Sequence, residues 1–154
     1  MRTSFGLIAL FLFTTAPSFA QVQSPFRVHC GGPAYTDSKG QVWAADSGYV
    51  HGESVTSTNT VTGAVDPALY QIARNFPTAL KGTIQYSFII PNEKYPVNMY
   101  FSEMNAASYR SGARLFNVSL QYERVFTNLD IFEEAGANAP MIKGADITVN
   151  SGQL

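Results

Sequence analysis

The chain has 154 residues and a formal net charge of -1, with 14% charged and 45% hydrophobic residues. This length is typical of one domain, and the hydrophobic content argues against an intrinsically disordered chain. No basic stripe is present, so we do not expect nucleic acid as a partner. With one Cys and two His, neither a disulfide framework nor a multi-thiolate zinc site is expected, and we predict no cofactor and no metal.

The N-terminal segment has the layout of a secretory signal peptide. A positive start at Arg2 precedes a nearly continuous apolar run over 5–13, and small residues at Ser18 and Ala20 occupy the two positions that a signal peptidase reads, with cleavage expected after Ala20. That run is shorter than the roughly twenty residues needed to span a bilayer, and no later run is long enough. We therefore expect residues 1–20 to be removed. The mature domain, 21–154, is expected to have no membrane span and to be secreted or to reside in the endoplasmic reticulum lumen.

Short segments of the mature chain alternate apolar and polar residues, which is typical of half-buried strands. Turn residues separate these segments, and one short helical turn is predicted at 130–134, ended by Gly136. Several short strands without a long helix predict one all-β domain, a sandwich or barrel of antiparallel strands. The segments are 26–30, 83–90, 95–102, 116–120 and 147–149.

The end of the sequence predicts a hairpin turn. Asn150-Ser151-Gly152 follows the last predicted strand, and such a turn returns the chain along its neighbour. Only Gln153 and Leu154 follow, which are too few for a strand. We therefore expect an open sheet edge and a truncated domain whose last strand or strands are missing.

Two neighbouring residues of the first segment are the most reactive side chains in it. Cys30 alternates with Val28, so we expect a buried, small apolar side chain, with a free or intermolecular thiol as the alternative. His29 then lies on the opposite face, where we expect a surface residue in preference to a metal ligand.

Catalytic motifs are weak. The stretch Gly52-Glu53-Ser54-Val55-Thr56 begins like a nucleophile elbow but lacks the final Gly, so His51 is expected to be a solvated loop residue and no partner of Ser54. The segment 37–40 offers oxygen ligands for calcium, although an Asx-type turn is the preferred interpretation. Five carboxylates could supply a glycosidase pair, but their separations do not follow from sequence: Glu53, Glu103, Asp130, Glu133 and Glu134.

Aromatic residues on loops favour sugar binding over catalysis. Pyranose C–H faces stack on aromatic rings, while nearby Asn, Asp and Glu side chains bind the hydroxyl groups. Tyr49 is the best loop candidate, because it lies between Gly48 and a loop containing His51. Tyr86 alternates with apolar residues and is expected in the core. Asn117-Val118-Ser119 matches an N-glycosylation acceptor on an outward face, although coincidence explains it equally well.

Six short motifs, in order along the chain, resemble the malectin domain family. The resemblance implies a jelly-roll-like β-sandwich that binds carbohydrate, typically an α-linked glucose disaccharide, without catalysis. The motifs are Phe26–Gly32, Ala44–Tyr49, Ala68–Gln71 followed by Arg74, Tyr100–Glu103, Leu115–Val118 and Leu129–Phe132.

The same resemblance implies a loop site of four aromatic residues and one Asp. Tyr49 matches the first ring, whereas Asn75 and Asn105 stand where the family has rings; Phe76 lies beside Asn75, and Tyr109 shares the loop of Asn105. The family's Asp follows the last hairpin, beyond the end of this sequence. These five residues form the predicted site for an oligosaccharide or a glycoprotein glycan. The alternatives are a protein-interaction or adhesion domain on the same fold and, less favoured, a fragment of a glycan-active enzyme.

Overall fold

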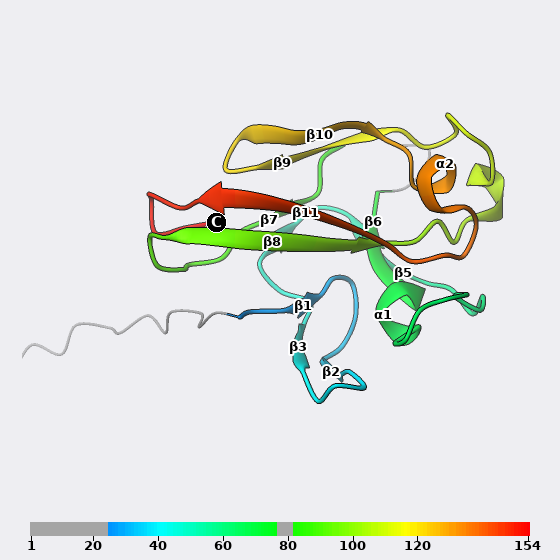
Figure 1. Cartoon of the computed structure of the whole chain (residues 1–154), viewed down its shortest axis with the longest axis horizontal. Coiled ribbons are helices and arrows are strands. Elements are labelled where there is room, and N and C mark those ends of the chain that lie inside the picture. The colour runs from blue at the N-terminus through cyan, green and yellow to red at the C-terminus, as the bar shows by residue number, and fades with distance from the viewer. Residues whose placement is uncertain (1–24, 77–81) are drawn as a thin grey trace, which may run out of the picture.

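The computed structural model describes residues 25–76 and 82–154, so the predicted signal peptide lies outside the described residues (Figure 1). The described chain is mostly strands with three short helices: α1 (Ala68–Gln71), the 3-10 helix η1 (Ala106–Ser108) and α2 (Ile131–Ala135). The strands are β1 (Val28–His29), β2 (Tyr35–Thr36), β3 (Val42–Ala45), β4 (Tyr49–Val50), β5 (Glu53–Thr56), β6 (Ile72–Asn75), β7 (Gln85–Tyr86), β8 (Lys94–Phe101), β9 (Phe116–Leu120), β10 (Glu123–Leu129) and β11 (Met141–Thr148).

The predicted all-β sandwich is confirmed. Its longest ladder pairs β8 with β11 in antiparallel register from Lys94↔Thr148 to Phe101↔Met141. The antiparallel hairpin β9–β10 lies over this ladder, and the small sheet β1–β3–β2 lies on the opposite side (Figure 1). Among the strand pairs of the described residues, β1 and β3 run parallel and the others are antiparallel; an isolated bridge between Glu103 and Ala137 is also parallel.

Two apolar clusters form the core between these layers. The first surrounds Val149, which is fully buried, and joins β11 to the segment around Ile90 and Tyr95. The second lies under α2, where Leu129, Ile131 and Met141 pack against partly buried rings such as Phe116. Burial of these apolar side chains is the main favourable contribution to stability, and it holds the loops between the strands in place.

Most predicted strands are present with the predicted facing. In β8 and β9 the inward residues alternate with exposed ones, and Asn117 lies on the outward face. The segment 83–90 alternates as predicted, but only Gln85–Tyr86 forms a ladder, with an isolated bridge at Ile89. Sequence patterns missed β10 because its register against β9 shifts twice, and Asn128 has a positive φ of 52°. Such irregularities break the two-residue period on which strand recognition depends.

The predictions for His29 and Cys30 were wrong. His29 is 4% exposed, and its Nδ1 lies 2.9 Å from the Pro33 carbonyl oxygen, while Cys30 is exposed. The reason is that only Val28 and His29 belong to β1. The next residues turn at Gly31, whose φ is +83°, and Gly32 packs directly on the imidazole ring. A turn breaks the alternation that the sequence pattern assumed.

The segment 150–152 contains a bend at Ser151 and Gly152, but the predicted hairpin is wrong: the described residues after it do not pair back on β11. After it, Gln153 forms an antiparallel bridge with Ile89, and Leu154 and Phe88 exchange two backbone hydrogen bonds of 2.8 and 2.9 Å. The two residues after the turn therefore pair with the segment before Ile90. In the part of the chain that the structure covers, no helix has the length and apolar character needed to cross a bilayer.

Asp130 caps α2 and ties it to the preceding loop. Its Oδ1 accepts a hydrogen bond from the Glu133 amide (3.1 Å) and its Oδ2 one from the Gly112 amide (2.6 Å). These bonds to the ionised form lower the pKa of Asp130 below its ordinary value. Because the folded-state pKa is the lower one, the stabilisation is present above the unfolded-state pKa of about 4 and is lost as the pH falls through the folded-state pKa.

We therefore expect Asp130→Ala to lower the melting temperature at pH 7 and to matter progressively less as the pH falls from about 5 to about 2. Thermal unfolding of both proteins across that range measures the difference. Asp130→Asn keeps one cap acceptor without the charge, so its difference from the wild type should shrink over the same pH range. A difference between wild type and Asp130→Ala that stays constant from pH 7 to pH 2 would contradict this account.

Candidate functional site

Strand β6 divides the predicted site into two side-chain clusters. Arg74 and Asn75 are consecutive residues of this strand, which pairs with β5 through Ser54↔Arg74 and Glu53↔Asn75. Consecutive side chains of a strand project to opposite faces. Arg74 contacts Tyr49, whereas Asn75 contacts Arg114.

The first cluster holds the ring of Tyr49. The Arg74 guanidinium carbon lies 3.4 Å from the centroid of this ring, and Nε of Arg74 donates to Oδ2 of Asp46 at 2.8 Å. The other oxygen of Asp46 accepts from the Tyr86 hydroxyl, also at 2.8 Å. One face of Tyr49 is therefore covered by a cation, but the residue remains 44% exposed. Because the Tyr49 ring is already held in place, it would lose little conformational freedom when a ligand binds to it.

Two groups of this cluster have pKa values shifted away from neutrality, so Tyr86 stays neutral and Arg74 stays charged near pH 7. Burial, followed by hydrogen bonds with Cys30 and Asp46, raises the pKa of Tyr86 well above its usual range. Burial opposes the charge of Arg74, but the hydrogen bond and charge of Asp46 outweigh it and raise the pKa of the guanidinium. Arg74 therefore pairs with Asp46 beneath Tyr49, and the Tyr86 hydroxyl donates to the same carboxylate.

The second cluster is a polar network centred on Arg114. Its Nη1 donates to Oδ1 of Asn75 at 3.2 Å, and its Nε donates to Oε2 of Glu103 at 2.7 Å. The other oxygen of Glu103 accepts from the Asn105 backbone amide at 2.9 Å. The Glu103 side chain is only 4% exposed, so it positions the Asn105 loop and does not face solvent.

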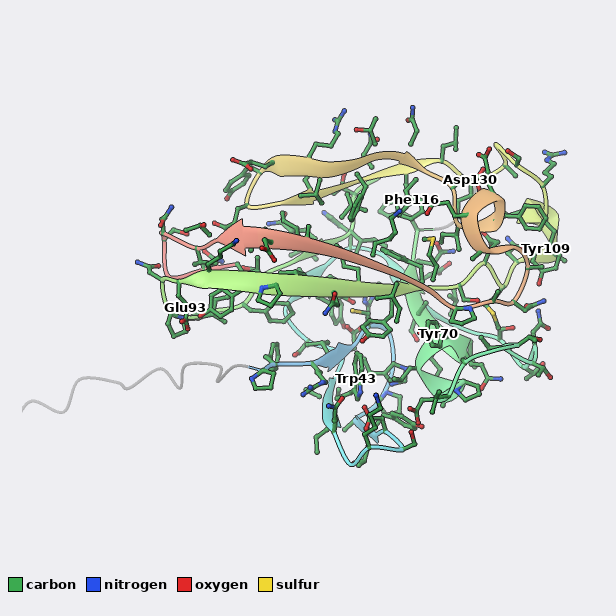
Figure 2. The ribbon with its side chains drawn as sticks, in the orientation of Figure 1. Trp43, Tyr70, Glu93, Tyr109, Phe116 and Asp130 are labelled. Carbon is green, nitrogen blue, oxygen red and sulfur yellow. The ribbon has the colours of Figure 1, made fainter. Side chains whose placement is uncertain are left out.

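Tyr109 lies at the same end of the sandwich, beside α2 (Figure 2). Its hydroxyl donates to Oδ1 of Asn138 at 2.8 Å and accepts from Asn59 at 3.2 Å, and its ring stacks on Phe132 with centroids 5.9 Å apart. The backbone amide of Asn138 donates to the Glu103 carbonyl. The network therefore links Tyr109 to the residues around Arg114.

The structure brings together three of the five predicted residues, Asn75, Asn105 and Tyr109. Phe76 follows Asn75 at the end of β6 and packs its ring against Gly82. Tyr49 lies on the Arg74 side of β6, in strand β4, which pairs with β7.

Three residues of these clusters were not identified from the sequence. Asp46 and Arg114 hold the surrounding side chains in place, and Asn138 is a hydrogen-bond partner of Tyr109. A polar residue in each of these loops was the only available signal, because their partners are far away in the sequence.

The other candidates have structural partners. The Ser54 hydroxyl donates to the Gly31 carbonyl at 2.5 Å and has no bond to His51. Oδ1 of Asp37 accepts from the backbone amides of Lys39 and Gln41, which confirms the Asx-type turn. Within residues 25–76 and 82–154, no three His, Cys, Asp or Glu side chains gather in a way that could hold a metal ion.

The sequence model of the malectin domain matches residues 24–154. The chain belongs to the malectin domain family. It is 32% identical over 109 residues to a probable LRR receptor-like serine/threonine-protein kinase of Arabidopsis thaliana, covering 68% of this chain and 10% of the relative. The chain thus spans about a tenth of the length of that relative.

Solved structures of similar fold agree with this assignment. The extracellular domain of ANXUR2 from Arabidopsis thaliana superposes with a TM-score of 0.70 at 21% identity, covering 83% of this chain and 41% of that one. A Bacteroides uniformis beta-glucuronidase gives 0.70 at 22% identity, covering 83% of this chain but only 15% of the enzyme. At this identity the likeness establishes the malectin-like fold, and this fold is found in extracellular parts of receptor kinases.

Proposed function

We propose that this malectin domain binds carbohydrate without transforming it, through the surface formed by Tyr49, Asn75, Phe76, Asn105 and Tyr109. The observation that carries the proposal is the Arg114 network, which holds Asn75 and the Asn105 loop beside Tyr109. The Tyr109 ring beside these amides suits a glucose-containing oligosaccharide, because a ring stacks on C–H faces and the amides bind hydroxyl groups.

A non-catalytic role is supported by what the nearby carboxylates do. A glycosidase needs two carboxyl groups that face the sugar. Glu103 is instead buried and paired with Arg114, and Asp130 is buried as the cap of α2. Export is part of the proposal, since the apolar N-terminal segment fits a signal peptide. The ligand would then be an oligosaccharide or a glycoprotein glycan met in the secretory pathway or outside the cell.

We expect Tyr49→Ala and Tyr109→Ala each to weaken binding of an α-linked glucose disaccharide about tenfold, because each removes a ring that stacks on the sugar. Amide NMR titration of the protein with the disaccharide measures the affinity and maps the residues that move. Tyr122→Ala is the matched control, since Tyr122 is 100% exposed in the β9–β10 turn. Unchanged affinity in folded Tyr49→Ala and Tyr109→Ala proteins would refute this site.

A protein-binding role is the second candidate, and one observation favours it. The amide oxygen of Asn75 is already bound by Arg114, and an amide takes the place of a family ring at both 75 and 105, so the site has less stacking surface than the family pattern implies. If the disaccharide and longer glucans leave every amide signal of the Tyr49–Tyr109 surface unmoved, the weight passes to this candidate.

A further inference from the structure

A groove of about 290 Å³ lies between the β2–β3 turn, the loop before α1, and the adjoining ends of β8 and β11. None of the five residues of the proposed site lines it. Figure 2 shows Trp43 and Tyr70 on the side of β8 that faces away from the β9–β10 hairpin, whereas Tyr109 lies beside α2. The groove is therefore separate from the surface described above.

Tyr100 is the aromatic platform of this groove. The residue is 38% exposed, and its ring meets Trp43 edge-on, with centroids 5.0 Å apart and planes at 88°. Tyr70 leans on it from α1 at 6.1 Å. Directly opposite Tyr100 in the β8–β11 register is Ile142, which is 55% exposed. An aromatic and an aliphatic side chain therefore share one rigid, solvent-facing patch.

Polar groups with unused bonding capacity surround the platform. The hydroxyls of Tyr70 and Tyr100 form no hydrogen bond with any described residue. Oδ1 of Asp66 accepts two bonds, from Tyr35 and the Ser38 amide, whereas Oδ2 accepts one, from the Ser38 hydroxyl. A carboxylate has about four acceptor positions, so one is left on Oδ2. The groove thus offers donors and an acceptor next to a ring.

The same outward face continues past Tyr100 along β8. Asn98 is the next residue on that face, two positions away, and it is exposed. It stands opposite Gly144 of β11, and its Oδ1 occupies the space where a side chain at 144 would begin. An extended ligand seated on the Tyr100 ring would therefore meet an amide at the next cross-strand pair.

We infer that this groove is a second carbohydrate site, which takes one or two rings of a neutral oligosaccharide on Tyr100. The volume of about 290 Å³ is just below the roughly 300 Å³ at which typical small-molecule sites begin, so it fits one or two sugar rings and no more. Asp37 and Asp66 outnumber Lys39 in the lining, so an anionic sugar is disfavoured by charge. The site uses none of the residues of the proposed function and stands or falls independently of it.

The chain has one tryptophan, Trp43, and it lies in this groove, so its fluorescence reports ligand there. We expect maltotriose or cellotriose to change the Trp43 emission in a saturable way, while trigalacturonate changes it at least about tenfold less effectively because of the charge. The two neutral trisaccharides differ in linkage and identify which glucan the groove prefers.

Variants separate the groove from the other site. Tyr100→Ala should raise the half-saturating concentration about tenfold, and Tyr70→Phe, which removes only a hydroxyl, about threefold. Tyr109→Ala and the exposed-ring control Tyr122→Ala should leave the emission titration unchanged. Tyr70→Phe keeps the test decisive if Tyr100→Ala fails to fold, because its ring packing is intact.

The inference would be overturned by no emission change with either neutral trisaccharide, by a response to trigalacturonate alone, or by equal titrations for wild type and both groove variants. A loss of the emission response in Tyr109→Ala would also overturn it, since the response would then belong to the other surface. Disaccharide binding that moves only amides around Tyr109 and leaves Trp43 silent would support the proposed function and refute the groove.

Discussion

Replacing Asp46 by Ala is expected to lower the free energy of unfolding by about 3 kcal/mol, because it leaves the Arg74 charge without its partner in a buried place. Both side chains of this pair are 8% exposed. The Tyr86 hydroxyl loses its acceptor in the same substitution. Urea unfolding followed by circular dichroism measures the change. Because the Arg74 guanidinium packs on Tyr49, we also expect the Tyr49 amide and ring signals to broaden.

The chain contains a matched control for this prediction. Asp146 pairs with Lys94, and the two side chains are 59% and 66% exposed. Asp146→Ala removes the same carboxylate from an ion pair that water already screens, so its expected effect is below about 1 kcal/mol. Similar losses for Asp46→Ala and Asp146→Ala would mean that burial of the Arg74 pair does not matter to stability.

Gly31→Ala is expected to cost about 4 kcal/mol, combining a strained backbone with a steric clash. Gly31 has a φ of +83°, and a Cβ atom there would lie 2.4 Å from the backbone carbon of Ala73 in β6. The nearest atoms are all backbone atoms of Ala73 and Arg74, which cannot move aside as the end of a flexible side chain could. The β5–β6 ribbon that carries Arg74 and Asn75 would therefore have to move. Thermal and urea unfolding report the loss.

Gly40→Ala separates the two causes. Gly40 also has a positive φ, +75°, but a Cβ atom there would meet nothing within 4 Å. Its expected cost is therefore the backbone part alone, about 1 kcal/mol. If Gly31→Ala costs no more than Gly40→Ala, the close approach to Ala73 is not a constraint on this fold.

The two sites differ in how far they follow from sequence. Tyr49 and Tyr109 were recognisable as loop aromatics, and Asn75 and Asn105 by their place in a family pattern. The Trp43–Tyr70–Tyr100 groove had no such signal, because its rings come from three separate segments. Trp43 and Tyr100 are brought to 5.0 Å only by the packing of β3 against β8.

Local patterns were sufficient for β8, β9 and the short helix near 130–134, because alternation and helix-ending glycines depend on neighbours a few residues away. Local patterns could not predict which of His29 and Cys30 is buried, because this depends on the turn at Gly31 and on its packing against Ala73. The same holds for the partners of Arg74. Long-range packing determines which polar side chains come into contact. Where these side chains are buried, each needs its partner, because a buried charge without a partner is strongly destabilising.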